Sequence, residues 1–118
     1  MQIFIHGDSM RNHIVAIIFP DPEELVKWCN QRGLGGDTHA ERIKHPELRE
    51  AIESDLARLA KESNFNSLEK VKSNFAFVEK EFEVGVVLTP TMKIKRKQAR
   101  DVFQELIAEI YKKADSAI

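Results

Sequence analysis

The chain has 118 residues, a length that suits one compact domain and leaves little room for a second. Its formal net charge is -1, so bulk charge does not favour nucleic acid or an anionic membrane as a partner. The longest apolar run, residues 14–19, is too short for a membrane-spanning helix, and the single cysteine excludes an internal disulfide.

The beginning of the chain predicts a β-hairpin followed by a helix. Residues 2–6 are rich in β-forming side chains, residues 7–9 supply turn chemistry, and residues 14–19 are all apolar. Because no polar residue interrupts this run, we expect its strand to be buried on both faces. Asp21 is the expected cap of a helix that runs to about Arg32, with Gly33 directly after it.

The middle of the chain predicts a loop and an amphipathic helix. Residues 33–38 contain three glycines, but the other features of a phosphate-binding loop are absent, so we interpret them as a structural loop. Pro46 opens a helix that runs to about Ser63. Its apolar stripe consists of Leu48, Ile52, Leu56 and Leu59. The remaining acidic and basic residues of this helix indicate a solvated flank, not paired catalytic carboxylates.

The second half of the chain predicts two short extended segments and a terminal helix. Ser67 begins a short turn through Val71, and residues 75–77 and 84–88 are expected to be extended. From about Lys97 to Tyr111, apolar residues including Val102 recur at helical spacing. The whole pattern predicts an α+β fold, in which about three helices pack on a small, mostly antiparallel β-sheet.

The histidines and the cysteine do not form a known metal-binding or nucleophile motif. The histidines are His6, His13, His39 and His45, and their spacing matches neither a zinc finger nor H-E-x-x-H. We therefore expect no metal site. Cys29 shares a predicted helix with Leu25 and Trp28, which indicates a packed thiol and not a nucleophile.

Residues 89–100 contain five cations and no acidic residue. The cations are Lys93, Lys95, Arg96, Lys97 and Arg100. This segment is either a contact for an anionic group or a solvated helix start, although cations are unfavourable at a helix start because of the helix dipole. No aromatic residue lies among the cations, which disfavours binding of single-stranded nucleic acid.

The same segment resembles a motif of a known family. Residues 88–96 read LTPTMKIKR and resemble the signature near the end of AMP-forming acyl-CoA synthetases, in the form typical of the long-chain fatty acid branch of this adenylate-forming superfamily. Residues 2–9, 15–22, 27–28 and 65–72 resemble the same branch in the same order. The resemblance therefore extends from Gln2 to about Lys112. Thr91 and Met92 match the long-chain form, whereas other members often have a small residue followed by glycine.

The resemblance implies a domain and a reaction. Residues 1–118 would be the mobile C-terminal domain of a two-domain long-chain fatty acid:CoA ligase, whose N-terminal domain, which binds ATP and the fatty acid, is absent. Such an enzyme forms acyl-AMP and pyrophosphate, and then rotates the small domain so that coenzyme A forms the thioester and AMP leaves. We expect that Met1 is not the natural start of the parent and that the isolated chain is inactive.

The resemblance also assigns individual residues. Lys93 matches the lysine that enters the adenylation site, where an ammonium stabilises the negative charge that gathers at the α-phosphate. Thr91 and Arg96 are implied as further contacts with the nucleotide, Arg96 through a phosphate. Thr89, Pro90 and Thr91 are implied to shape the loop. A coenzyme A contact is expected, but no motif places it.

Substrates, partners and location follow from the same resemblance. The parent would use ATP, Mg²⁺, coenzyme A and a fatty acid, with the N-terminal domain as partner and no nucleic acid. It would be intracellular, in the cytoplasm or on the cytosolic face of membranes, attached through regions outside this chain. Two alternatives remain open. One is a non-catalytic interaction module in which Lys93 is dispensable; the other is a salt-sensitive binder of nucleic acid or anionic lipid through residues 93–100.

Overall fold

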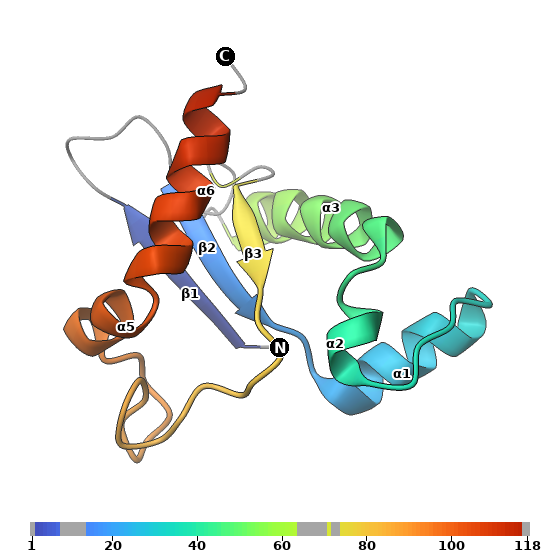
Figure 1. Ribbon diagram of the computed structural model, residues 1–118, viewed down its shortest axis with the longest axis horizontal. Coiled ribbons are helices and arrows are strands. Elements are labelled where there is room, and N and C mark those ends of the chain that lie inside the picture. Colours follow the sequence, from blue (N-terminus) through green and yellow to red (C-terminus); the bar gives the residue numbers. More distant parts are fainter. Residues whose placement is uncertain (1, 8–13, 64–70, 72–73, 117–118) are drawn as a thin grey trace.

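The computed structural model describes residues 2–7, 14–63, 71 and 74–116, which form a three-stranded sheet with helices on both faces (Figure 1). In chain order the elements are β1 (Gln2–Gly7), β2 (Ile14–Phe19), α1 (Pro22–Gln31), α2 (His39–Arg42), α3 (Pro46–Ser63), β3 (Phe75–Phe77), α5 (Arg96–Val102) and α6 (Gln104–Ser116). The predicted α+β class is confirmed.

The central strand of the sheet is β2. It pairs antiparallel with β1, so that Gln2 lies opposite Phe19, and parallel with β3, so that Ala16 lies opposite Phe75. The sheet is therefore mixed and not wholly antiparallel. The difference arises because α1, α2 and α3 lie between β2 and β3 in the chain, and such a crossover returns the next strand in the same direction.

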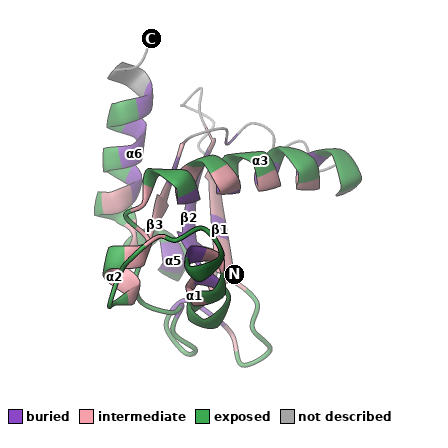
Figure 2. Cartoon of the chain, turned by 90° about the vertical axis from the view of Figure 1, so that its right-hand side faces the viewer, coloured by how far each residue is buried: buried purple, intermediate pink, exposed green. Residues whose placement is uncertain are grey.

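The side chains of β2 divide the molecule into two cores. Val15, Ile17 and Phe19 belong to the core under α5 and α6, whereas Ala16 and Ile18 belong to the core under α1 and α3. None of these five side chains is more than 7% exposed, which confirms the predicted burial on both faces. Figure 2 shows the buried residues on the strands and on the inward sides of the helices.

Two helices have the features that the sequence predicts. The backbone N–H of Glu23 donates a hydrogen bond to Asp21 Oδ1 at 3.0 Å, which caps α1, and Gly33 follows this helix with a φ of 67°. The bounds of α3 are those expected, and its stripe is buried at Leu48, Ile52 and Leu56. Ion pairs of Arg58 with Asp55 and with Glu62 lie on its solvent side, as a solvated flank requires.

The prediction of one continuous terminal helix is wrong. It is divided at Phe103 into α5 and α6, and Val102, which we expect in the apolar stripe, is 53% exposed. The sequence also does not predict the short helix α2, which is capped by the side chain of Thr38. The described residues thus form five helices where about three are expected. None of these helices has both the length and the apolar character that crossing a membrane requires.

The segment 84–88 is not the extended strand that we expect. The carbonyl of Glu83 accepts hydrogen bonds from the N–H groups of Val86, Val87 and Leu88, and Gly85 has a φ of 90°. The chain therefore turns tightly here and leaves only isolated bridges. The predicted turn runs from Ser67 to Val71, and its residues 67–70 lie outside the described part of the chain.

A substitution at Leu56 tests how much this side chain stabilises the core under α1 and α3. The change Leu56→Ala removes a side chain that is 2% exposed, so we expect the free energy of unfolding to fall by about 2–5 kcal/mol. Urea unfolding followed by circular dichroism measures this loss. Ser54→Ala, on the exposed side of the same helix, is the matched control and should change the free energy by less than about 0.5 kcal/mol. Equal losses in the two variants would contradict the assigned orientation of α3.

Candidate functional site

The segment that carries the predicted site residues folds as a tight hairpin. Leu88 and Ile94 form an antiparallel bridge, the N–H of Thr89 donates to the carbonyl of Lys93 at 2.8 Å, and the N–H of Met92 donates to the carbonyl of Thr89 at 2.8 Å. Residues 90–92 are thus a three-residue hairpin loop. We call residues 88–94 the lysine hairpin. It lies beside α5, at the end of the molecule opposite the C-terminal end of α6 (Figure 1).

The two threonines of the lysine hairpin hold its loop. Thr89 Oγ1 accepts a hydrogen bond from the N–H of Lys93 at 3.1 Å, and it lies 3.1 Å from Thr91 Oγ1. Hydroxyls commonly satisfy nearby backbone groups in turns in this way. The hydroxyl of Thr89 is therefore bonded directly to the backbone of the lysine whose side chain is the main candidate for function.

Met92, directly before Lys93, has an uncommon backbone conformation. Its φ is 66°, and it is the single non-glycine residue with a positive φ among those described. The left-handed region places Cβ close to the next carbonyl oxygen, at a cost of about 1–2 kcal/mol. The loop therefore stores backbone strain next to the candidate lysine, and backbone strain often accompanies functional sites.

The lysine hairpin and α5 together form a basic end of the domain. Lys93, Arg96, Lys97 and Arg100 are exposed and Lys95 is half-buried. The first turn of α5 contains no acidic residue, and the Lys95 side chain makes no capping hydrogen bond. Nothing in the helix itself favours this charge pattern, because cations at a helix start oppose the dipole.

The structure brings Thr91 and Lys93 together on one loop and fixes Arg96 separately. Arg96 Nη1 donates to the carbonyl of Ile5 in β1 at 3.2 Å, which ties the start of α5 to the sheet. Arg96 therefore has a structural contact as well as the phosphate contact that the resemblance implies. The guanidinium has five N–H donors, so one bond to Ile5 leaves others for a ligand.

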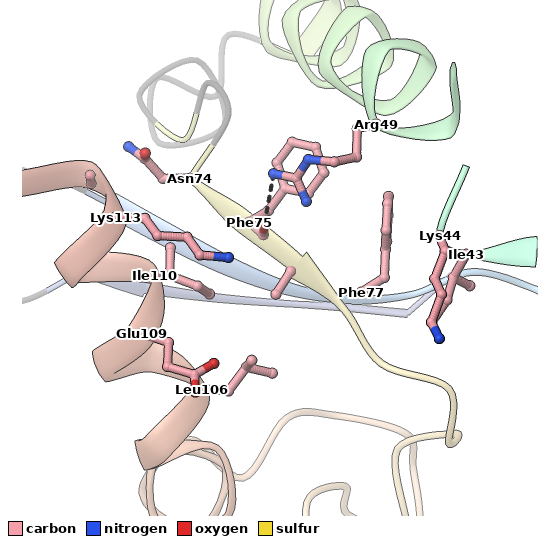
Figure 3. Close-up of a pocket in the computed structure, with 12 residues that line it drawn as sticks. Ile43, Lys44, Arg49, Asn74, Phe75, Phe77, Leu106, Glu109, Ile110 and Lys113 are labelled. Atoms are coloured by element: carbon pink, nitrogen blue, oxygen red, sulfur yellow. Dashed lines mark hydrogen bonds between the residues drawn. The ribbon is translucent and has the colours of Figure 1, made fainter. Parts of the chain in front are cut away.

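A separate cavity of about 610 Å³ lies at the open edge of β3, between α3 and α6 (Figure 3). Its floor contains Phe75 and Phe77. The guanidinium of Arg49 lies 4.3 Å from the centre of the Phe75 ring, and Nη2 donates to the Phe75 carbonyl at 3.0 Å. Burial lowers the pKa of Arg49, and Glu53 acts in the opposite direction. The residues that line this cavity include none from the lysine hairpin or α5.

The sequence assigns no role to Arg49. The one available signal is its position beside the apolar stripe of α3, next to Leu48 and three residues before Ile52. A cation at such a position can cover an aromatic ring with its stem and planar head.

The cysteine and the histidines are the other candidates that the sequence analysis considers. Cys29 is 2% exposed in the core under α1 and α3, so the packed thiol is confirmed. His45 Nε2 lies 2.5 Å from the carbonyl of Gly35 and so holds the glycine-containing loop. His13 lies outside the described residues. Within the described ranges, no group of three or more His, Cys, Asp or Glu residues is arranged to hold a metal ion.

Met92 provides a test of the loop strain. At this φ, Met92→Gly should exceed Met92→Ala in free energy of unfolding by about 0.5–1 kcal/mol, because glycine removes the Cβ clash but gains entropy in the unfolded chain. Both variants lose the same exposed side chain, so their difference isolates the backbone term. Urea unfolding measures the difference, and an alanine variant more stable than the glycine variant by about 0.5–1 kcal/mol, the entropic cost of glycine alone, would show that the loop is unstrained.

The lowered pKa of His39 predicts that the stability of the domain depends on pH. Burial lowers its pKa from the ordinary 6.5, Arg42 acts in the same direction, and Glu79 and Asp21 partly oppose them. The unfolded chain therefore takes up a proton near pH 6.5 before the folded chain does, and stability falls as the pH drops below that value. We expect the melting temperature to fall less between about pH 7.5 and 5.5 in His39→Gln than in the wild type. Equal decreases would remove His39 as the cause.

Comparison with known proteins identifies relatives of the chain. No protein-family model matches it. It is 39% identical over 110 residues to long-chain-fatty-acid–CoA ligase 6 of Homo sapiens and 36% identical over 110 residues to long-chain-fatty-acid–CoA ligase 1 of the same species. It is also 34% identical over 111 residues to the peroxisomal long chain acyl-CoA synthetase 6 of Arabidopsis thaliana. These matches cover 93–94% of this chain, which spans only 16% of the length of each relative.

Two solved structures share the fold. One is the adenylation domain of a carboxylate reductase from Mycobacterium chelonae, with a TM-score of 0.69 and 23% identity over 93% of this chain and 15% of that one. The other is a didomain of a carboxylic acid reductase from Segniliparus rugosus, with a TM-score of 0.68 and 23% identity over 98% of this chain and 14% of that one. The chain is therefore a homologue of one segment of the long-chain fatty acid–CoA ligases, and its fold also occurs in these two reductase structures.

Proposed function

We propose that residues 1–118 form the C-terminal domain of an AMP-forming long-chain fatty acid–CoA ligase. The observation that carries this proposal is the 39% identity to a long-chain-fatty-acid–CoA ligase over 93% of the chain. A match to 16% of the relative's length is what a small domain of a larger enzyme would give. The remaining length would include the N-terminal domain that binds ATP and the fatty acid.

The proposed reaction has two steps. A carboxylate oxygen of the fatty acid attacks the α-phosphorus of ATP, the bond to pyrophosphate breaks, and acyl-AMP forms. The thiol of coenzyme A then attacks the acyl carbonyl carbon, so that the thioester forms and AMP leaves. The solved didomain from Segniliparus rugosus is in complex with AMP, which supports a nucleotide as substrate for the parent of this chain.

In this proposal Lys93 stabilises the first step. Attack on the α-phosphorus concentrates negative charge on the phosphate oxygens, and an ammonium held close to them in a water-poor site lowers the barrier. Lys93 is exposed on the lysine hairpin, and its backbone is held at both N–H and C=O by Thr89. A side chain on such a loop can enter another domain's site without reordering its own backbone.

Thr91 and Arg96 are proposed as supporting contacts with the nucleotide. The Thr91 hydroxyl lies on the same loop as Lys93, and Arg96 can use the N–H groups that Ile5 does not engage. Both contacts would form when the domain closes on the bound nucleotide.

Mg²⁺ and coenzyme A enter the proposal as substrates of the whole enzyme. Among the described residues no group of three or more His, Cys, Asp or Glu is arranged to hold a metal ion. The proposal assigns no step to Mg²⁺ on this domain. We propose an intracellular enzyme, in the cytoplasm or on the cytosolic face of membranes, with any membrane attachment outside this chain.

Lys93→Ala in the full-length parent tests the proposal. We expect fatty-acid-dependent release of pyrophosphate to fall by a factor of about 100 or more, the scale on which a lost oxyanion-type contact acts. Acyl transfer from supplied acyl-AMP to coenzyme A should remain largely intact. Lys97→Ala, another exposed cation of the same segment, is the matched control and should retain activity.

Two results would overturn the proposal. One is wild-type release of pyrophosphate by the Lys93→Ala enzyme, and the other is a wild-type parent that forms no acyl-CoA with any chain length. Either result would favour the interaction module as the function of this domain. Affinity for nucleic acid or anionic lipid that falls steeply with salt and depends on residues 93–100 would favour the basic-surface binder.

A further inference from the structure

The cavity at the open edge of β3 is separate from the residues that the proposed function uses. It has a volume of about 610 Å³, and none of the described residues that line it belongs to the lysine hairpin or to α5. A volume of this size lies in the range of small-molecule sites. Its walls come from α3, from α6 and from the segment after α2, with β3 as the floor (Figure 3). The cavity is therefore a second candidate site.

The floor of this cavity is apolar. Phe75 is 3% exposed and Phe77 is half-buried, and the centres of their rings lie 5.4 Å apart. Aliphatic side chains continue this surface on the two sides of β3, and they include Ile43, Leu106 and Ile110. Such a floor can accept the hydrocarbon part of a ligand, because contact with it removes methylene groups from water.

The walls of the cavity carry positive charge. Lys44 and Lys113 are exposed and Arg49 is half-buried, whereas Glu109 is the one acidic residue among the described lining residues. Three cations against one carboxylate leave a formal charge of +2. Figure 3 shows the Lys113 side chain extending from α6 toward β3. An apolar floor beside an excess of cations suits a ligand with an apolar body and a negative head.

Arg49 is the cation that the fold holds in place. Its guanidinium lies 4.3 Å from the centre of the Phe75 ring, and Nη2 donates to the Phe75 carbonyl at 3.0 Å. Burial lowers the pKa of Arg49 in spite of the nearby Glu53, so the protein bears a cost for this charge that an anion in the cavity would offset. The guanidinium is planar and has five N–H donors, a geometry that matches a carboxylate.

The backbone of β3 offers a further donor beside Arg49. The N–H of Val78 donates to the carbonyl of Ile18 in β2 at 2.9 Å, so the N–H of Phe77 points to the opposite, open edge of the sheet. In a parallel ladder, one residue of the next strand would donate to the Phe75 carbonyl and accept from the Phe77 N–H. Arg49 already takes the first of these places. An oxygen atom bound to Arg49 is thus positioned to take the second.

We propose that this cavity is a binding site for an amphipathic carboxylate, a molecule with one carboxylate head and an unbranched aliphatic chain. The carboxylate accepts hydrogen bonds from the guanidinium of Arg49 and the N–H of Phe77, and Lys113 adds a second positive charge. The chain lies on the apolar floor. A phosphate monoester fits less well, because it would bring close to two negative charges toward Glu109.

Titration of the 118-residue chain with decanoate tests the site. This chain is used because, in the parent, a fatty acid would also bind as the substrate. With ¹⁵N-labelled protein and decanoate below its micelle concentration, we expect the amide signals of Ala76, Phe77 and Leu106 to shift until they saturate. Shifts that do not saturate, or that leave these three signals unchanged, would overturn the proposal.

Substitutions of the cations identify the binding groups. Arg49→Gln should raise the dissociation constant of decanoate at least about tenfold, because it removes a charge-assisted hydrogen bond. Lys113→Gln, at an exposed position that leaves the fold intact, should raise it about threefold. Lys97→Gln makes the same change of charge on α5 and is the matched control, with an effect of less than about twofold. An unchanged constant in Lys113→Gln, or in a folded Arg49→Gln, would contradict the proposal.

Related compounds test the two parts of the ligand. Acetate, which lacks the chain, should bind at least about tenfold more weakly than decanoate. Decyltrimethylammonium has the same chain and the opposite charge, and it should not shift the three amide signals. Equal binding of acetate would remove the role of the apolar floor. Equal binding of the cationic compound, or tighter binding of decyl phosphate, would overturn the assignment of a carboxylate head.

The site does not rest on the proposed function, because the residues that form it include neither Lys93 nor its hairpin. If Lys93→Ala abolishes pyrophosphate release in the parent but decanoate does not bind to the chain, the proposed function stands and the second site is wrong. If decanoate binds as expected but the Lys93→Ala enzyme is fully active, the second site stands and the role of Lys93 is wrong.

Discussion

The fold depends on one strand that must be covered on both sides. β2 carries apolar side chains toward α6 at Val15 and Ile17 and toward α1 and α3 at Ala16 and Ile18. Helices on one face alone would leave the other set of side chains in water, at a cost of roughly 25 cal/mol for each Å² of apolar surface. The two helical layers are therefore a requirement of the sequence of β2. The chain between β2 and β3 supplies one layer and the segment after β3 supplies the other.

The same constraint determines where the lysine hairpin lies. Val87 and Leu88, each 3% exposed, place the base of this hairpin in the core that β2 shares with α6. The N–H of Lys95 donates to the carbonyl of Val87 at 2.7 Å and closes the base from the other side. Lys93 remains exposed at the far end. A buried base and an exposed charged end are what a residue needs if it acts on a substrate held elsewhere.

Local signals explain why part of this architecture can be predicted from the sequence. The start of α3 follows from Pro46 and a regular apolar spacing, and the position of Lys93 in a loop follows from its motif. Three features depend on contacts that local patterns do not contain. Gly85 turns a segment whose apolar residues suggest a strand, Phe103 divides a helix whose periodicity is unbroken, and Met92 adopts a φ for which methionine gives no signal.

Arginine side chains occupy both open edges of the sheet. The N–H of Ala16 donates to the carbonyl of Asn74, on the β3 side of β2, so Ala16 and the opposite Ile5 do not bond to each other. The carbonyl of Ile5 therefore points away from β2, where it accepts a hydrogen bond from Arg96. At the other edge, Arg49 bonds to the outward carbonyl of Phe75. A strand from another molecule would have to displace these guanidinium groups before it could extend the sheet. The two arginines therefore oppose pairing of the folded domain's sheet edges with a strand of another chain.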